Sequence, residues 1–286
     1  MLGKLTIILV SFFSDNRIKS LLNNIYKYNK IIIVENSLSQ NFKEEIEKKY
    51  QNTEVIIPSK NLGNGGGINF AINNIKTKLA LYLDIDVKIS QNVINELYRV
   101  GINNKEWAII APNLKGVKYK KDLFTNNDYS KEICEINFVE GCALLFHLPT
   151  IRKLRMFDEK FFLYYEENDL FYRCLKKKKK ILLMNRYYVE HKNNTGSDKK
   201  FDKDIRYLRH WHLMWSKFYY YRKNFSYIRG LSETYKSFIS AFLKSIYYYY
   251  LNKDKYNKYL NRFSGLLNSY MGKKSWKRAN IKYEDI

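Results

Sequence analysis

The first third of the chain alternates between short apolar runs and mixed segments. Four runs are almost entirely apolar, at residues 5–13, 31–34, 55–57 and 79–83, and the first of them contains several β-branched residues. Such runs are typical of strands that are buried on both faces. Between them, Asp15 is a candidate N-cap before apolar residues at helical spacing, and residues 41–50 and 64–75 are predicted helices. This alternation predicts βαβ units and a mostly parallel sheet flanked by helices, an α/β fold.

The pattern becomes less regular in the second half. We expect a strand with a glycine approach point at 137–146, a helix with an acidic start at 161–175, and a strand at 181–189. Residues 192–204 form a polar segment that is a candidate mobile lid. From Ile205 onward the spacing is helical and aromatic. We therefore divide the chain into a main region at 1–225, with halves at about 1–90 and about 91–225, and a helical extension at 226–286.

Two apolar stripes mark the helical extension. The first consists of Leu231, Tyr235, Phe238, Ile239, Phe242, Ile246 and Tyr249, and the second of Tyr256, Leu260, Phe263, Leu267 and Tyr270. Lys236, Ser240 and Lys244 lie opposite the first stripe. Two interpretations stay open. The helices either pack against the main region or a second subunit, or they form an interfacial pair on an anionic membrane surface.

The chain is strongly basic. Its 51 Lys and Arg against 28 Asp and Glu give a formal charge of +23, with the basic residues concentrated after Arg152. This balance indicates a polyanionic partner, although a solvated Lys-rich surface explains part of the charge. Cys134, Cys142 and Cys174 lack CxxC spacing, which favours free thiols in a reducing cytosol. No apolar run has the length of a signal peptide or a membrane span, so we expect a soluble or peripheral protein.

An Asp-x-Asp pair follows the fourth predicted strand. Asp84 and Asp86 are two residues apart on an extended segment, so their side chains point the same way. Two carboxylates at a strand end form an oxygen-rich site that suits a divalent cation bound to a diphosphate. Asp86 is the better direct ligand because it lies further from the core, whereas Asp84 would contact the ribose or a metal-bound water. Asp is also common in turns at strand ends. We favour a functional pair because the strand before it is apolar and would hold both carboxylates at the rim of the sheet.

Two more polar features follow predicted strands. Glu35 ends the second strand, where a carboxylate can accept a hydrogen bond from a nucleobase, although Ser37 or Ser39 there can also cap a helix. A glycine cluster after the third strand contains Asn61, Gly63, Gly65, Gly66, Gly67 and Asn69. Glycines permit positive φ and close approach of the backbone to a ligand, or to a tightly packed neighbouring strand. We predict that Glu35, Asn61, Gly63, Gly66 and Asn69 bind the nucleotide.

Three carboxylates lie close together in the second half. Glu166, Glu167 and Asp169 repel one another, which tends to raise their pKa values and suits a general base. An acidic first turn of a helix is the alternative explanation. An aromatic run at 161–165 precedes them and indicates a packed pocket wall rather than an exposed helix start. His191, after the last predicted strand, is a candidate third metal ligand.

Seven segments, taken in order, resemble the family 2 glycosyltransferases. They are the apolar first strand, IIIVENS, NLGNGGGIN, LYLDIDV, FVEGCALLF, MFDEKFFLYYEENDLFYR and VEHKNNTGS, and YYYRKN also matches a late segment. The resemblance covers about residues 4–225 and is stronger to the rhamnosyltransferase-like branch that builds cell-surface polysaccharides. It implies a catalytic region at 1–225, with a nucleotide-binding half at about 1–90 and an acceptor half at about 91–225. It implies the GT-A fold, a Rossmann-like and mostly parallel sheet flanked by helices, here with a C-terminal helical extension.

The resemblance also implies roles for single residues. Glu35 takes the place of the acid that reads the nucleobase, which is usually Asp. Asp84 and Asp86 match the DxD pair that binds the metal and the sugar nucleotide. Glu167 matches the catalytic base, and His191 matches a histidine that can ligate the metal.

The match departs from the family at the base. The usual residue there is Asp, so Glu166 or Asp169 can take the role that the resemblance gives to Glu167. Arg173 matches an arginine that would bind phosphate of the sugar nucleotide or brace the acids. Gly141 matches a glycine near the acceptor site.

The function that the resemblance implies is inverting, metal-dependent glycosyl transfer by a hexosyl- or rhamnosyltransferase with Mg²⁺ or Mn²⁺. The donor would be a UDP- or dTDP-sugar and the acceptor a glycan or polyprenyl-linked sugar of bacterial surface polysaccharide synthesis. We expect no nucleic-acid partner and a cytoplasmic location, peripheral on the inner face of the membrane, with a homodimer through the C-terminal helices as an option. Two alternatives stay open: a basic nucleic-acid-binding protein, since aromatic residues stack on bases, and a nucleotidyltransferase on a similar scaffold.

Overall fold

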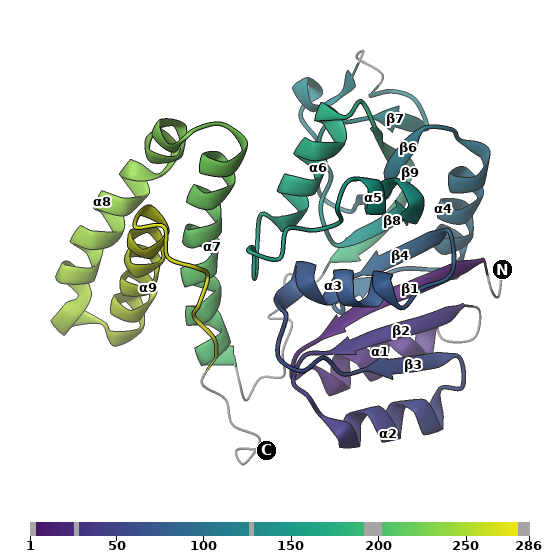
Figure 1. Ribbon diagram of the computed structural model, residues 1–286, viewed down its shortest axis with the longest axis horizontal. Coiled ribbons are helices and arrows are strands. Elements are labelled where there is room, and N and C mark those ends of the chain that lie inside the picture. Colours follow the sequence, from purple (N-terminus) through teal and green to yellow (C-terminus); the bar gives the residue numbers. More distant parts are fainter. Residues whose placement is uncertain (1–3, 26–28, 126–128, 192–201, 280–286) are drawn as a thin grey trace. The chain divides into compact units, whose positions relative to one another are not determined.

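The structure is a computed structural model that describes residues 4–25, 29–125, 129–191 and 202–279. The chain divides into two compact units (Figure 1). Unit 1 consists of Met1–Phe157 and Leu170–Asp198, and unit 2 of Asp158–Asp169 and Lys199–Ile286. The boundary that we predicted at residue 225 separates a catalytic region from an extension and stays a prediction.

Nine strands form one sheet in the described part of unit 1. They are β1 (Leu5–Ser11), β2 (Lys30–Glu35), β3 (Thr53–Ile56), β4 (Leu79–Leu83), β5 (Val87–Lys88), β6 (Trp107–Leu114), β7 (Ile133–Glu135), β8 (Ala143–His147) and β9 (Lys180–His191). The order is β3-β2-β1-β4-β8-β6-β9-β5, with β7 beside β9. The first four strands in this order run parallel, as the strand–helix alternation predicts. β8 lies antiparallel between β4 and β6.

The central strands are buried on both faces, which explains their continuous apolar sequences. Alternate residues of β1 point to opposite sides: Leu5, Ile7 and Leu9 pack in one cluster and Ile8 in another. The first cluster includes apolar residues of α1 (Asp15–Ile25), α2 (Gln40–Lys49) and α4 (Gln91–Asn103). The second includes residues of α3 (Gly63–Asn73), α5 (Leu148–Lys153) and the later part of α6 (Glu166–Lys176). Unit 1 is therefore a three-layer α/β/α structure.

Two expected elements are shorter than predicted. The strand expected at 137–146 is confirmed only as β8, because residues 137–142 form bends and turns before it. The helix expected at 161–175 begins at Glu166, after a non-helical aromatic segment. A short 3₁₀ helix, η1 (Lys121–Leu123), lies between β6 and β7. Of the predicted lid at 192–204, residues 192–201 lie outside the described residues, and Asp202 already begins α7.

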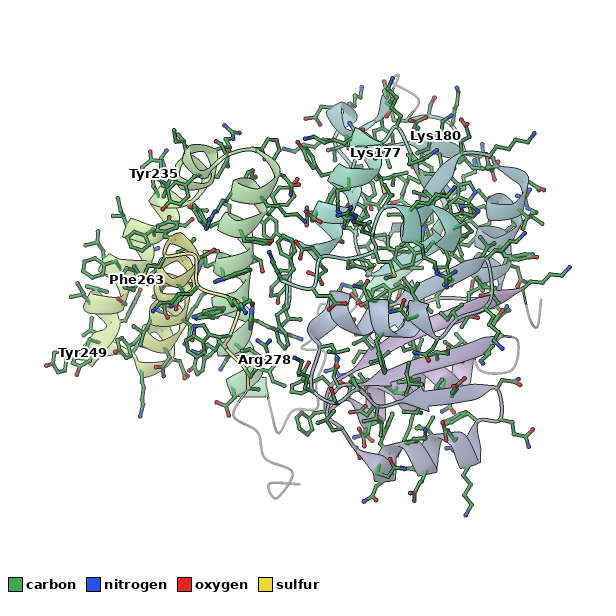
Figure 2. The ribbon with its side chains drawn as sticks, viewed as in Figure 1. Lys177, Lys180, Tyr235, Tyr249, Phe263 and Arg278 are labelled. Atoms are coloured by element: carbon green, nitrogen blue, oxygen red, sulfur yellow. The ribbon has the colours of Figure 1, made fainter. Side chains whose placement is uncertain are left out.

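Unit 2 contains α7 (Asp202–Asn224), α8 (Tyr227–Leu251) and α9 (Lys253–Tyr270). They pack through small residues. A Cβ at Gly265 of α9 would lie 2.3 Å from the Trp211 carbonyl oxygen of α7, and a Cβ at Gly230 of α8 would lie 2.7 Å from the Phe218 ring. Phe238 of α8 and Phe263 of α9 meet with ring centroids 4.8 Å apart, and Figure 2 labels Phe263. The predicted helical extension is thus confirmed as helices that pack on α7.

The segment after α9 is tied to α7. The Trp215 indole N–H donates to the Lys273 carbonyl at 3.0 Å. The His212 Nε2 lies 2.9 Å from the Lys277 carbonyl oxygen, and its Nδ1 lies 2.9 Å from the Ser275 hydroxyl. Since a carbonyl only accepts, His212 carries its proton on Nε2 and accepts from Ser275. None of the described helices is long and apolar enough to cross a membrane.

Candidate active site

The end of β4 holds the two aspartates in place. The Asp84 backbone N–H donates to the Cys142 carbonyl at 2.8 Å, which continues the β4–β8 pairing by one residue. The Asp84 carbonyl accepts from the Val87 N–H at 3.1 Å, so the chain turns there. The Tyr82 hydroxyl is hydrogen-bonded to the Asp84 carboxylate. Asp84 therefore sits at the rim of the sheet with both backbone and side chain fixed.

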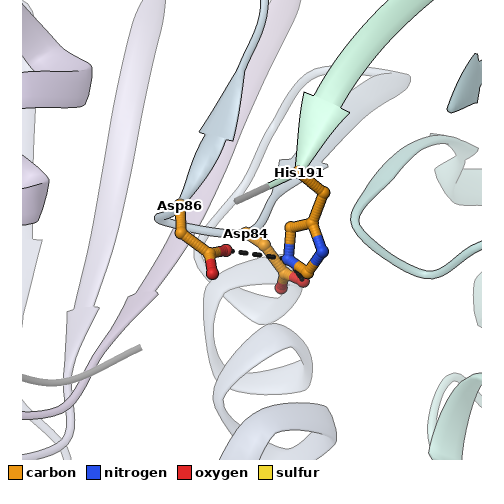
Figure 3. Close-up of side chains that lie close together, drawn as sticks. All are labelled: Asp84, Asp86 and His191. Carbon is orange, nitrogen blue, oxygen red and sulfur yellow. Dashed lines mark ion pairs between the residues drawn. The ribbon is translucent and has the colours of Figure 1, made fainter. Parts of the chain in front are cut away.

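Strand pairing brings His191 to this pair. β5 pairs antiparallel with β9, and Val87 lies opposite His191 in this register. The His191 Nε2 is 2.9 Å from Oδ1 of Asp86 and 3.5 Å from Oδ2 of Asp84 (Figure 3). One ligand atom from each of the three side chains lies within 4.8 Å of the others. The structure thus brings together all three residues that we predicted as metal ligands.

The electrostatics of this cluster are strongly coupled. Hydrogen bonds to Asp84 and Asp86 raise the pKa of His191 to about 10, against the opposing effect of burial. Without a cation, the imidazole is therefore protonated at neutral pH and neutralises one of the two carboxylates. A divalent cation would replace that proton and bind two carboxylate oxygens and a neutral imidazole. This donor set fits a cation such as Mn²⁺, which accepts oxygen and imidazole ligands.

Glu35 lies at the end of β2, opposite Ser11 in the β1–β2 register. It is 1% exposed, and its Oε1 accepts from the Ser37 N–H at 2.8 Å. Burial raises the pKa of Glu35, although the hydrogen bonds from Ser37 act in the opposite direction. The Ser37 hydroxyl accepts in turn from the Phe13 N–H at 2.6 Å. Glu35 is thus a rigidly held acid at the same edge of the sheet as Asp84.

The glycine cluster is pinned to the end of β2 by Asn36. Its side chain accepts from the Leu62 N–H at 3.1 Å and donates to the Gly63 carbonyl at 3.0 Å. The Asn61 side chain accepts from the Gly63 N–H at 2.9 Å, and Gly63 has a φ of 74°. Here glycine provides the left-handed conformation that begins α3. The turn therefore has a structural explanation, and the predicted nucleotide contacts of Asn61 and Gly63 stay predictions.

Close packing explains the next glycines. Gly66 is buried in α3. A Cβ at Gly67 would lie 2.9 Å from Cγ1 of Val10, so α3 approaches β1 closely at this point. The Asn69 amide group makes two hydrogen bonds to the Phe157 backbone, at 2.9 and 3.0 Å. Asn69 therefore fixes the chain before residue 158, and a role for Gly66 and Asn69 in nucleotide binding stays a prediction.

Arg173 of α6 braces the same stretch. Its guanidinium donates to the carbonyl of Leu154, and also to the carbonyl of Met156 at 2.6 Å. We predicted that Arg173 binds phosphate or braces the acids. The structure shows it bound to the backbone that leads to Phe157, and a phosphate contact stays a prediction.

The three candidate bases belong to unit 2, in the segment Asp158–Asp169, which we call the acid segment. Tyr164 and Tyr165, just before Glu166, have φ values of 66° and 67°. Two consecutive tyrosines in the left-handed region cost about 1–2 kcal/mol each. Such strain persists only where surrounding contacts impose it, and it concentrates at functional sites.

Residues on one face of α7 impose this conformation. The Ser216 hydroxyl donates to the Leu163 carbonyl at 2.8 Å. The Tyr219 ring packs against Phe161 at 4.8 Å between centroids, and its hydroxyl donates to Asp158 at 3.0 Å. The Tyr220 ring lies 5.5 Å from that of Tyr165. These α7 residues are three to four positions apart and therefore share a face.

An ion network around the buried Asp169 completes this face. The Lys223 ammonium lies 2.8 Å from Asp158 and 2.7 Å from Asp169, and the Asn224 amide donates to Asp169 at 3.0 Å. Asp169 is fully buried and Glu166 is 3% exposed, whereas Glu167 is half-buried. Burial would raise the pKa of Asp158, but the contacts from Lys223 leave it lowered. Of the three acids, Glu167 is the most accessible.

Our sequence reasoning did not identify Ser216 and Lys223 as partners of the acids. The spacing of Ser216, Tyr220, Lys223 and Asn224 in the segment around YYYRKN shows that they share one helix face. It does not show that this face meets the acid segment, because that contact joins distant parts of the chain. It likewise did not identify Tyr82 as a hydrogen-bond partner of Asp84, although both lie at the end of the same predicted strand.

Comparisons with known proteins agree with this geometry. Residues 15–147 match the family described as Glycosyl transferase family 2. A curated relative, the low-salt glycan biosynthesis hexosyltransferase Agl10 of Haloferax volcanii, is 23% identical over 193 residues. That match spans 60% of this chain and 62% of the relative, somewhat less than two thirds of its length.

Two solved structures share the fold. The mannosyltransferase PcManGT of Pyrobaculum calidifontis, in complex with GDP-Man and Mn²⁺, matches with a TM-score of 0.61 at 10% identity, covering 95% of this chain and 88% of that protein. TarS 1–349 of S. aureus, in complex with UDP-GlcNAc, matches with a TM-score of 0.55 at 14% identity, covering 94% and 92%. At these identities the structures show the fold alone. The family match thus covers residues 15–147, and the two structures show that the chain shares the fold of these glycosyltransferases, the GT-A fold.

Proposed function

We propose that this protein is a metal-dependent, inverting glycosyltransferase that uses a sugar nucleotide as donor. The observation that carries the proposal is the cluster of Asp84, Asp86 and His191 at the rim of the sheet, in a chain that matches this family over residues 15–147. Two related folds support it, since one was solved with GDP-Man and Mn²⁺ and the other with UDP-GlcNAc. This proposal takes the place of the nucleic-acid-binding and nucleotidyltransferase alternatives.

The roles of the rim residues follow from their chemistry. Asp86 and His191 would hold the cation, and Asp84 would bind either the cation or the ribose. When bound, Mg²⁺ or Mn²⁺ would supply the positive charge that stabilises a leaving nucleoside diphosphate. Glu35 would accept a hydrogen bond from the nucleobase, with Asn61, Gly63, Gly66, Asn69 and Arg173 around the nucleotide. The donor that we propose is a UDP- or dTDP-sugar.

Glu167 is the base that we propose. It would remove the proton from the acceptor hydroxyl while that oxygen attacks the anomeric carbon and the diphosphate leaves, so the configuration inverts. Exposure supports Glu167 over its neighbours, because Glu166 is buried and Asp169 is fully buried in contact with Lys223. Asp169 would then position the acid segment instead of taking the proton.

The acceptor that we propose is a surface glycan or its polyprenyl-linked precursor in polysaccharide synthesis. The named relative is a glycan biosynthesis hexosyltransferase, which supports this class of acceptor. A lipid-linked acceptor would require the cytoplasmic enzyme to work at the inner face of the membrane, as a peripheral protein. Alternatively, the C-terminal helices would form the interface of a homodimer.

The test measures nucleotide binding through its effect on the thermal unfolding temperature, Tm. UDP, dTDP and GDP are each added to the wild-type protein with Mn²⁺ and with EDTA. We expect one nucleotide to raise the Tm only when Mn²⁺ is present, since a ligand that binds the folded state stabilises it. Asp86→Asn should lose this Mn²⁺-dependent shift, whereas the matched control Asp122→Asn, at an exposed position, should keep it. Equal shifts with EDTA and with Mn²⁺ would refute metal-dependent donor binding.

A further inference from the structure

A basic pocket lies between α8 and α9, within unit 2. Its volume is about 320 Å³, in the range of small-ligand pockets. The polar residues that line it are Lys236, Ser237, Ser240, Lys244, Tyr259 and Arg262. These described lining residues supply three cations and three hydroxyl groups, and no carboxylate. The pocket has no part in the transfer chemistry proposed above.

The cations of this pocket create a local positive field. The Lys244 ammonium lies 5.2 Å from the centre of the Tyr259 ring, which holds it at the pocket wall. Burial lowers the pKa of His210 to about 4, and the charges of Lys258, Arg262 and Arg206 act in the same direction; of these three, Arg262 lines the pocket. Three like charges that line one pocket repel one another unless an anion joins them. Phosphate suits such a site, because its oxygens accept from guanidinium, ammonium and hydroxyl groups together.

The outer face of α8 is apolar. Its exposed residues at helical spacing are Ile228, Tyr235, Ile239, Phe242, Leu243, Ile246 and Tyr250, which we call the α8 stripe. Ile239, Leu243 and Ile246 are 52%, 57% and 59% exposed. Figure 2 labels Tyr235 and Tyr249 toward the two ends of this helix. An exposed apolar stripe of this length indicates an interaction surface.

The buried face of α8 carries small residues. They are Gly230, Thr234, Ala241 and Ser245. A helix of a soluble protein normally buries its large apolar residues and exposes polar ones. α8 does the reverse at Ile239, Leu243 and Ile246, although Phe238 and Phe242 pack on Phe263 within unit 2. The exposed large side chains are therefore available for contacts outside the helical unit, and the small ones serve close helix packing.

The pocket and the stripe are adjacent sides of one helix. Lys236, Ser240 and Lys244 each directly follow a stripe residue in sequence. Consecutive residues of an α-helix are about 100° apart around its axis. A ligand that matches both sides has an anionic head beside an apolar body, so it is an amphiphile.

We propose that α8 and α9 bind an anionic membrane surface, with a lipid phosphate headgroup in the pocket and the α8 stripe in the boundary between headgroups and acyl chains. The inference deepens the proposed function, from which it takes the membrane setting of the acceptor. Charge supports the choice of lipid, because α8 and α9 together carry seven basic and two acidic residues. Tyrosine is also enriched at the membrane interface, where its ring lies in apolar surroundings and its hydroxyl in polar ones.

A second copy of this chain fits the surface less well. In an antiparallel two-fold pair of α8 helices, each flank meets the same flank of the other copy. Lys236 and Lys244 would then share a flank with their counterparts of the other copy, and like charges across an interface disfavour association. An anionic bilayer instead neutralises this flank while it covers the stripe.

The test is cosedimentation of the full chain with vesicles, in the absence of any donor. We expect binding to vesicles that contain phosphatidylglycerol and little binding to pure phosphatidylcholine. The pocket variant K236Q/K244Q/R262Q should bind the anionic vesicles on the order of 100-fold more weakly. The control variant K48Q/K105Q/K120Q loses the same charge at exposed positions of unit 1 and should stay within about threefold of wild type. Equal binding by the pocket and control variants would overturn the pocket site.

Further experiments separate membrane binding from dimerisation and from binding of free phosphate. The stripe variant I239Q/L243Q/I246Q should also lose vesicle binding while it keeps the wild-type circular dichroism spectrum. If it instead converts a dimer into a monomer and still binds vesicles, the stripe is a dimer contact and the inference is wrong. If inorganic phosphate binds in the pocket but the protein does not bind vesicles, the assignment of the pocket to a lipid headgroup is wrong.

Donor hydrolysis without vesicles distinguishes the two proposals. The pocket and stripe variants should hydrolyse the sugar nucleotide at the wild-type rate, because neither variant changes the rim of the sheet. If the pocket variant hydrolyses the donor normally and binds vesicles as tightly as wild type, the membrane inference is wrong and the proposed function is unaffected. Vesicle binding that depends on the pocket, in a protein without hydrolysis or transfer, would support the inference and count against the proposed function.

Discussion

The metal cluster of unit 1 and the acid segment of unit 2 are held in place by different means. Asp84 and Asp86 follow a buried strand, and backbone pairing with β8 and β9 sets their position. The acid segment has no strand, and side chains of α7 hold its strained turn through a few buried polar contacts. A site built by backbone pairing should tolerate changes in nearby side chains. One built by side chains should fail when a single contact is removed.

The largest effect should appear at the proposed base. Glu167→Gln should lower kcat by about 10²–10⁴-fold, because a general base contributes that much to a transfer reaction. The Mn²⁺-dependent Tm shift with nucleotide should be unchanged, since the rim residues are intact. Steady-state transfer kinetics and thermal unfolding measure the two parts separately. Glu159→Gln, at an exposed position of the same segment, is the matched control. Near-normal transfer by Glu167→Gln would show that another acid is the base.

The ion network is the next largest target. Lys223→Met should lower the free energy of unfolding by about 1–3 kcal/mol, because it removes a cation 2.7 Å from the fully buried Asp169 carboxylate. Urea denaturation measures this loss, with Lys217→Met on the same helix as the control. Lys223→Arg should recover part of the stability and of kcat. A stability loss as small as that of the control would mean that the acid segment is not held by this contact.

The two units should also differ at their tightest glycines. A Cβ at Gly265 would meet a backbone carbonyl of α7, whereas a Cβ at Gly67 would meet the side chain of Val10. A side chain can shift more easily than helix backbone. We therefore expect Gly265→Ala to cost about 3 kcal/mol and Gly67→Ala about 1 kcal/mol, measured by urea denaturation. The opposite ranking would show that α9 can move away from α7 more easily than α3 from β1.

The smallest effect is a pair of opposite pH dependences. Contacts with Asp84 and Asp86 raise the pKa of His191, to about 10. In metal-free protein, its contribution to stability is therefore fully present below the unfolded pKa of about 6.5 and is lost as the pH rises toward 10. Burial lowers the pKa of His212 to about 3, so its contribution is present above about 6.5 and is lost as the pH falls toward 3.

Thermal unfolding with EDTA across this pH range tests both signs. The Tm difference between wild type and His191→Gln should shrink as the pH rises above neutrality. The difference between wild type and His212→Gln should shrink as the pH falls below it. If both differences change in the same direction, one of the two protonation states is wrong.

The apolar runs made most of unit 1 predictable. The first four predicted strands are confirmed because strands buried on both faces need continuous apolar sequence. The antiparallel placement of β8 was not predictable, since it depends on which strand lies beside β4 and not on local spacing. The predicted helix start at residue 161 was wrong because Tyr164 and Tyr165 adopt left-handed φ values that α7 imposes.

The C-terminal helices show the same division between local and long-range information. The spacing of Tyr235, Ile239, Phe242 and Ile246 predicted an apolar stripe, and α8 carries it. Spacing could not tell which side of that helix is buried. The choice depends on Gly230, Ala241 and Ser245, whose small side chains permit close packing against the other helices of unit 2.

The sequence by itself determined that Glu35, Asp84 and Asp86 share one rim. Each follows an apolar strand, and the carboxyl ends of parallel strands meet at the same edge of a sheet. Only the tertiary structure decided that His191 joins Asp86 and that Lys223 neutralises Asp169. Both contacts join residues far apart in the chain. They depend on strand register and helix packing, which local hydrophobic patterns do not encode.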